Sequence, residues 1–146
     1  MCLYDKVYNI LNYKYIPSDN YYKLNQINNQ IHSAKIKSNK LTASYYSERI
    51  KELYAKKYSI INEISCFKFY SNLNDRYTYD LHGIHGYQVD AFLDAIFDYN
   101  YIINQSKFNL ITGKGNVIKL KTLKYLKYFN INFINLDGFF KIINFT

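Results

Sequence analysis

Glycine, proline, cysteine and tryptophan are all scarce in this chain. It has five glycines, one proline, two cysteines and no tryptophan, and residues 1–76 contain no glycine. Two cysteines are too few for a disulfide framework, and we expect a reducing compartment, the cytoplasm. No apolar run reaches the roughly 18 residues of a transmembrane helix, and no membrane contact is expected. The N-terminus reaches Asp5 and Lys6 early and has no small-residue cleavage site, which is not the pattern of a signal peptide.

What the chain does contain is typical of a globular protein. Of its 146 residues, 49% are hydrophobic and 21% are charged, and the net charge is +8. Asn, Ile, Lys and Tyr together make up 72 residues, and all four have AT-rich codons. The positive charge therefore has two explanations, which are an AT-biased genome and a nucleic-acid partner.

The placement of the glycines divides the chain into two predicted domains, 1–76 and 77–146. In the first, apolar residues recur every three or four positions over 20–38 and again over 41–70, which predicts two helices, the second one long. Lysines dominate the charges there. They fit a solvated helix face or a phosphate-binding surface.

The second domain alternates between strand and helix patterns. The order β-α-β-α-β-β predicts a small mixed four-stranded sheet covered by helices, a two-layer α/β sandwich. The expected elements are strand 77–81, a helix over 89–100, strand 107–112, a helix over 116–128, and a hairpin over 131–145 turning at Asp137-Gly138.

The first candidate site is Asp80-Leu81-His82-Gly83, at the end of the first predicted strand. Residues two apart on a strand share a face, so Asp80 and His82 should point the same way while Leu81 enters the core. A carboxylate beside an imidazole orients its tautomer, which suits a general acid or base. Gly83 permits a sharp turn beside a ligand. An ordinary strand end with a satisfied histidine has the same pattern.

The second candidate site is Gly113-Lys114-Gly115-Asn116, between the second strand and its helix. Backbone N–H groups, a helix N-terminus and a lysine there can bind a phosphate, although the segment is too short for a Walker loop. In parallel strands both candidate loops lie at the carboxyl edge of the sheet, where open α/β sheets bind ligands. We therefore predict that Asp80 and His82 point to the same side and lie within about 10 Å of the Gly113–Gly115 loop.

A lysine-rich helix follows the loop and contains no acid up to residue 127. Lys114, Lys121 and Lys124 can share one side of it, as a phosphate track or as codon-biased surface charge, and the segment also carries Lys119 and Lys127. His85 adds a third potential metal ligand to Asp80 and His82, but no fourth is visible. We expect no metal and no cofactor.

These motifs, in this order, resemble the Smr (small MutS-related) domain. The resemblance rests on Asp80-Leu81-His82-Gly83 and Ile111-Thr112-Gly113-Lys114-Gly115-Asn116, and extends to the helix 120–126 and the Asp137-Gly138 hairpin. The stretch from Ala43 to Asn72 is similar to the helical region that often precedes eukaryotic Smr domains.

The resemblance implies a fold like the C-terminal domain of bacterial initiation factor three, and endonuclease activity on RNA at ribosomes. It makes Asp80 and His82 the functional pair, expected to be catalytic, and the Gly-Lys-Gly loop the phosphate contact. Together with the lysine track, the expected nucleic-acid contacts are Gly83, Gly113, Lys114, Gly115, Asn116, Lys119, Lys121 and Lys124. The expected partners are mRNA or rRNA and the ribosome, with DNA as the alternative substrate. Val117-Ile118 stand where many relatives carry His-Ser. Two other functions therefore stay open: an RNA- or ribosome-binding factor without cleavage, and a protein-interaction module.

Overall fold

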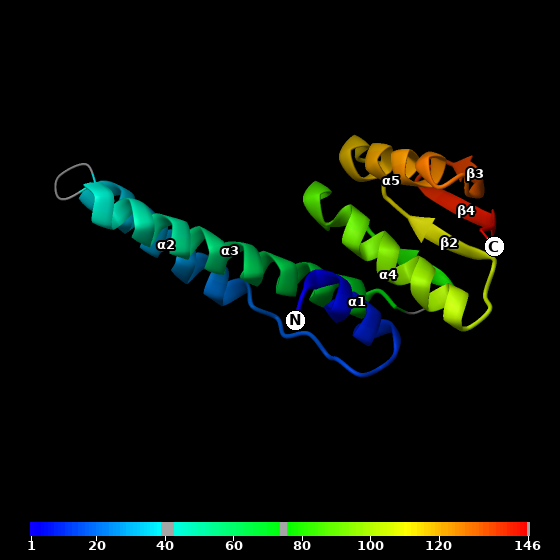
Figure 1. The fold of residues 1–146 in the computed structure, drawn as a ribbon, viewed down its shortest axis with the longest axis horizontal. Coiled ribbons are helices and arrows are strands. Elements are labelled where there is room, and N and C mark those ends of the chain that lie inside the picture. Colours follow the sequence, from blue (N-terminus) through cyan, green and yellow to red (C-terminus); the bar gives the residue numbers. More distant parts are fainter. Residues whose placement is uncertain (39–42, 74–75, 146) are drawn as a thin grey trace. The chain divides into compact units, whose positions relative to one another are not determined.

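A computed structural model describes residues 1–38, 43–73 and 76–145 of the chain. The helices are α1 (Leu3–Leu11), α2 (Tyr21–Ser38), α3 (Ala43–Ser71), α4 (Val89–Ile102) and α5 (Asn116–Tyr128), with a 3-10 turn η1 (Gly86–Gln88) before α4. The strands are β1 (Thr78–Asp80), β2 (Phe108–Ile111), β3 (Asn132–Leu136) and β4 (Phe139–Asn144) (Figure 1). Residue 41, the predicted start of the long helix, lies outside the described residues. No helix within the described ranges is both long and apolar enough to cross a membrane.

The four strands form one mixed sheet in the order β1-β2-β4-β3. β1 and β2 are parallel, with Asp80 opposite Ile111, and β4 is antiparallel to both β2 and β3. Ile111 also pairs with Phe139, the first residue of β4, so the β3–β4 turn lies at the same edge as the ends of β1 and β2. The predicted β-α-β-α-β-β order and the two-layer sandwich are confirmed.

The core lies between one face of this sheet and the helices. Tyr79, Leu110, Phe140 and Ile142 alternate with less buried neighbours along their strands, and all four are at most 4% exposed. Helices α4 and α5 contact each other. Because Tyr79 faces this core, Asp80 projects from the opposite face of β1.

Helix α1 packs against α4, which the sequence did not predict. Val7 and Ile10 are fully buried or nearly so, and they belong to the same hydrophobic cluster as Phe92 of α4. The hydroxyl of Tyr4 donates a 2.6 Å hydrogen bond to the carboxylate of Asp98 on α4. Residues before the first predicted helix are thus part of the sheet-containing unit.

The chain forms two compact units, and they differ from the predicted division at residues 76 and 77. One unit consists of residues 1–17 and 65–146, and the other of residues 18–64. The last turns of α3 belong to the first unit because Cys66 and Phe69 are buried there, and the ring of Phe69 meets that of Phe92 edge to face at 5.2 Å. The predicted boundary follows the change from helices to strands, whereas the units follow packing.

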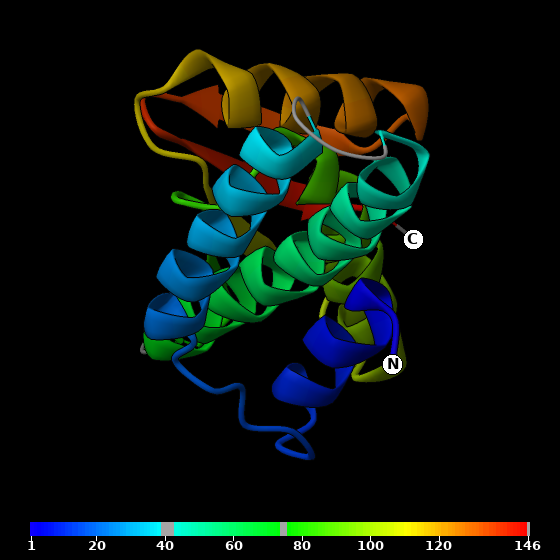
Figure 2. The same ribbon diagram turned by 90° about the vertical axis from the view of Figure 1, so that its left-hand side faces the viewer.

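The unit of residues 18–64 is a pair of helices with its own small core. α2 and the first part of α3 run side by side in both ribbon views (Figures 1 and 2). Their buried contacts are Ile27, Ile31, Ala34 and Leu53. The Nζ of Lys35 donates a 2.7 Å hydrogen bond to the hydroxyl of Tyr54, which lowers the pKa of that phenol from its ordinary value.

Candidate active site

Asp80 and His82 form a hydrogen-bonded pair at the carboxyl end of β1. The Nδ1 atom of His82 lies 2.6 Å from Oδ1 of Asp80, and the backbone N–H of His82 donates to the same oxygen at 3.0 Å. The carboxylate accepts the Nδ1 proton, which leaves the lone pair of a neutral imidazole on Nε2. The His82 side chain is 59% exposed and that of Asp80 only 17%. The pair therefore presents an exposed imidazole whose Nδ1 is held by the carboxylate.

The local backbone explains why these two side chains meet. Leu81 is fully buried, and its N–H continues the sheet by donating to the carbonyl of Ile111 at 2.7 Å. The residues on either side of it must then project from the opposite face. Gly83 follows with a φ of +87°, a left-handed conformation that turns the chain away directly after His82.

The Gly113 loop lies directly beside His82. Gly113 has a φ of +75°, and a β-carbon on it would stand 3.2 Å from Cβ of His82. This contact confirms the prediction that Asp80 and His82 point the same way and lie within about 10 Å of the loop. Glycine is favoured at this position both by its backbone conformation and by the closeness of the histidine.

A third loop, the turn between β3 and β4, completes this edge of the sheet. The carbonyl of Gly138 accepts hydrogen bonds from the N–H groups of Thr112 and Gly113, at 3.0 and 3.2 Å. The expectation that the Gly113 amide binds phosphate therefore needs correction, because that N–H already has a partner. Its contribution is to hold the loop against His82.

The N-terminus of α5 offers the donors that remain. Gly115 is the N-cap and has no side chain to cap the helix, and the first turn carries no acidic residue. Its first N–H groups, starting with Asn116, have no intrahelical acceptor, which is the usual setting for a bound anion. Gly115, Asn116 and the side chain of Lys114 are all exposed at this point. These residues form the part of the predicted phosphate site that the fold supports best.

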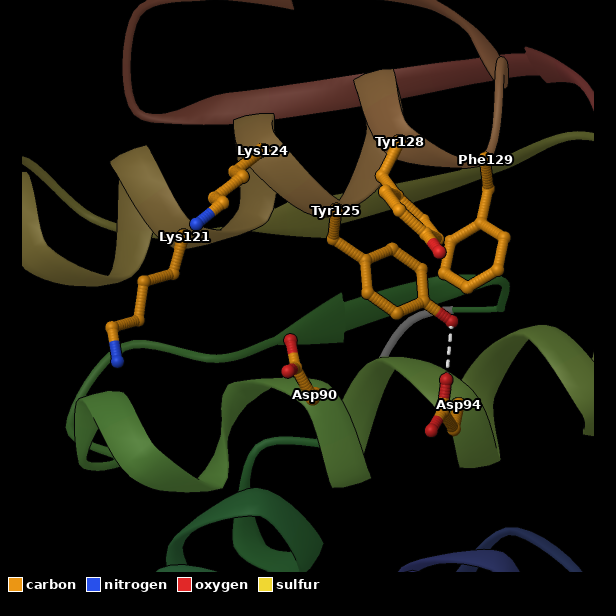
Figure 3. A pocket seen from close by; sticks show the side chains of 7 residues that line it. All are labelled: Asp90, Asp94, Lys121, Lys124, Tyr125, Tyr128 and Phe129. Atoms are coloured by element: carbon orange, nitrogen blue, oxygen red, sulfur yellow. Dashed lines mark hydrogen bonds between the residues drawn. The ribbon is translucent and has the colours of Figure 1, made fainter.

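The lysines of α5 do not form one uniform track. Lys121 approaches the loop after His82, because its Nζ lies 3.4 Å from the position of a β-carbon on Gly86. Lys121 and Lys124 both line a cavity between α4 and α5 that also receives Asp90 and Asp94 (Figure 3). Lys119 is half-buried and is not among the residues that line this cavity. Lys121 and Lys124 thus face one space, which carboxylates from α4 share, whereas Lys114, predicted on the same side, precedes α5 and does not line this cavity.

Lys68, near the end of α3, is a site residue that the sequence did not reveal. Its Cδ and Nζ lie 3.5 and 3.8 Å from the position of a β-carbon on Gly83, so its half-buried side chain covers the turn after His82. Only the burial of Cys66 and Phe69 in the sheet-containing unit brings the lysine there. No motif spacing carries that information.

His85 has a structural role instead of a ligand role. Its side chain accepts a hydrogen bond from the backbone N–H of Gln88, and the Gln88 side chain accepts one from the N–H of His85 at 2.8 Å. The two residues thereby cap η1. Across the described part of the chain, no three side chains of His, Cys, Asp or Glu come together in a way that could hold a metal ion.

Comparisons with protein-family models, with curated proteins and with solved structures found no match to this chain.

Proposed function

We propose that this protein is an RNA endonuclease of the Smr type, which cleaves without a metal ion and acts on mRNA or rRNA near the ribosome in the cytoplasm. The observation that carries the proposal is the Asp80–His82 pair, with its exposed imidazole side chain beside the Gly113 loop. The motif resemblance in the sequence agrees with it.

In the proposed reaction His82 acts as the general base. Its Nε2 takes the proton from a ribose 2′-OH, and the resulting oxygen attacks the adjacent phosphorus. The bond to the 5′ oxygen breaks, water donates a proton to that leaving oxygen, and the hydroxide that remains takes the proton from the His82 imidazolium, which restores the base. The products are a 2′,3′-cyclic phosphate and a 5′-hydroxyl end. Asp80 remains a carboxylate, which orients His82 and stabilises the imidazolium.

The phosphate would be held next to this imidazole. The amides at the start of α5 and the ammonium of Lys114 supply donors and positive charge at the same sheet edge. Lys68 adds a second cation above Gly83. Charge that develops on the phosphoryl oxygens would meet donors that are already in position.

The test is RNA cleavage by His82→Ala against the unchanged protein. We expect cleavage to fall by about 100-fold or more, the scale of losing a general base, while RNA binding persists. Lys107→Gln is the matched control, because Lys107 is exposed at the opposite, amino end of β2. Cleavage that is unchanged in His82→Ala would refute the assignment.

A second candidate is an RNA- or ribosome-binding factor that does not cleave. The observation that favours it is the charge of α5, which carries four lysines and no acidic residue and can bind phosphates without any cleavage chemistry. This candidate predicts RNA binding with no cleavage by the unchanged protein, and binding that His82→Ala leaves intact.

A further inference from the structure

A cavity of about 370 Å³ opens between α4 and α5, outside the Asp80–His82 site. Its size lies within the range of about 300–1,000 Å³ that is typical of small-ligand sites. Figure 3 shows its layout: Lys121 and Lys124 stand at one end and Tyr128 and Phe129 at the other, while Asp90 rises from α4 between them and Asp94 lies at the aromatic end, below the Tyr125 hydroxyl. Three kinds of chemical group therefore face one space.

The aromatic end provides a surface for a flat ring. Tyr128 is 79% exposed and Phe129 is 54% exposed, and their ring centroids lie 4.9 Å apart. Tyr125 continues this wall, with its ring 4.8 Å from that of Phe129. Exposed aromatic rings of this kind stack on the faces of nucleobases.

The charged groups of the cavity are available to a ligand. Within the described residues, Lys121, Lys124 and Asp90 make no ion pair with one another or with any other side chain. Asp94 accepts a 2.6 Å hydrogen bond from the Tyr125 hydroxyl, which fixes that carboxylate in place. Burial and this hydrogen bond raise the pKa of Tyr125, so the phenol stays protonated and remains a donor.

We propose that this cavity binds a guanine nucleotide. Guanine presents two adjacent N–H donors on its Watson–Crick edge, which match the carboxylate acceptors of Asp90 and Asp94, whereas adenine places a ring acceptor beside its amine. The base stacks on the ring of Tyr128, which meets Phe129 edge to face, and the phosphate meets Lys121 and Lys124. No other nucleobase combines a purine stacking face with two adjacent donors.

The cavity also lies near the proposed cleavage site. Lys121 is one of its lining residues and approaches Gly86, four residues after His82. On the basis of the proposed function, the bound guanine belongs to the RNA strand being cut and sets the position of cleavage. The nucleotide-binding part of the inference does not require cleavage.

The experiment is isothermal titration of the whole protein with guanosine, adenosine, cytidine and uridine 5′-monophosphates. We expect guanosine 5′-monophosphate to bind at least about 10-fold more tightly than the others, since a site built to pair with N–H donors rejects ligands that lack them. Tyr128→Ala should weaken it by about 10-fold, in line with the loss of one stacked ring. Tyr101→Ala, which removes a tyrosine that is 64% exposed on α4, is the matched control and should bind normally.

The same titration with His82→Ala separates this inference from the proposed function. Unchanged guanosine 5′-monophosphate binding by that variant is expected, because His82 does not line the cavity. Guanine-selective binding without any RNA cleavage would uphold the cavity and refute the nuclease. Equal affinity for all four nucleotides, or binding that Tyr128→Ala leaves unchanged, would overturn the inference even if the protein cleaves RNA.

Discussion

Alanine substitutions at the glycines of this sheet edge distinguish the cost of left-handed backbone strain from the displacement of His82. Gly113 has a φ of +75° and a would-be β-carbon 3.2 Å from Cβ of His82, whereas Gly115 has a φ of −70° and nothing within 4 Å. An alanine lowers the conformational entropy of the unfolded chain equally at both positions. This entropy contribution therefore cancels when the stabilities of the two variants are compared. What remains for Gly113→Ala is left-handed strain of about 1–2 kcal/mol, together with displacement of the histidine.

Gly138→Ala supplies the third member of the series. Gly138 has a φ of +83° with nothing within 4 Å, so its substitution adds strain without touching His82. For a chain of this size, 1 kcal/mol corresponds to roughly 2–4 °C, so both strained variants should melt about 2–8 °C below Gly115→Ala. Only Gly113→Ala should also cleave RNA more slowly, by about 10-fold or more, because the reaction depends on sub-ångström placement of its general base.

Thermal denaturation followed by circular dichroism, and RNA cleavage well below each melting temperature, measure the two effects separately. If Gly113→Ala melted together with Gly115→Ala, the strain argument would fail. If Gly113→Ala cleaved RNA as fast as Gly138→Ala, the position of His82 beside the loop would have no bearing on catalysis.

Three other predictions test the remaining parts of the account. Asp80→Asn should lower cleavage by about 100-fold or more while RNA binding stays intact, because the amide no longer fixes the tautomer of His82, and unchanged product yield would contradict this. Changing Lys121 and Lys124 to Gln should make the log–log slope of RNA affinity against salt concentration shallower by about 1.4. The same change at the exposed Lys14 and Lys107 should leave that slope unchanged. Equal slopes for the two double variants would show that the α5 lysines are ordinary surface charge. Burial raises the pKa of Tyr79 to about 12 from 10.0, so the protonated phenol stabilises the folded state fully below about pH 10 and that contribution is lost as the pH rises toward 12. Between pH 9 and 12 the free energy of unfolding in urea should therefore fall less for Tyr79→Phe than for the unchanged protein. Identical losses in the two proteins would refute this role of the Tyr79 phenol.

The contact between Asp80 and His82 beside the Gly113 loop was predictable because two local rules determine it. Alternation along a strand puts Asp80 and His82 on one face, and the parallel order of β1 and β2 puts Gly113 at the same edge. Both rules need only the identity and order of the elements. The helix and strand positions came from hydrophobic periodicity, which is strong in residues 77–146.

What the sequence could not reveal depends on contacts between distant segments. Lys68 reaches Gly83 only because the end of α3 packs with the sheet, and the Gly113 N–H is taken by the carbonyl of Gly138, 25 residues away in the chain. Spacing likewise placed Lys121 and Lys124 on one side of a helix without showing that Asp90 faces them from α4. Periodicity describes one element at a time and carries no information on which elements meet.

The central claim is that His82 removes the proton from a ribose 2′-OH. An RNA oligonucleotide with a single 2′-deoxy sugar, placed 5′ to a mapped cleavage site, tests it most directly. The account predicts that cleavage at that bond stops while neighbouring sites are still cut, and that the unmodified RNA yields 2′,3′-cyclic phosphate and 5′-hydroxyl ends. Continued cleavage at the deoxy position, or products with 5′-phosphate ends, would contradict it.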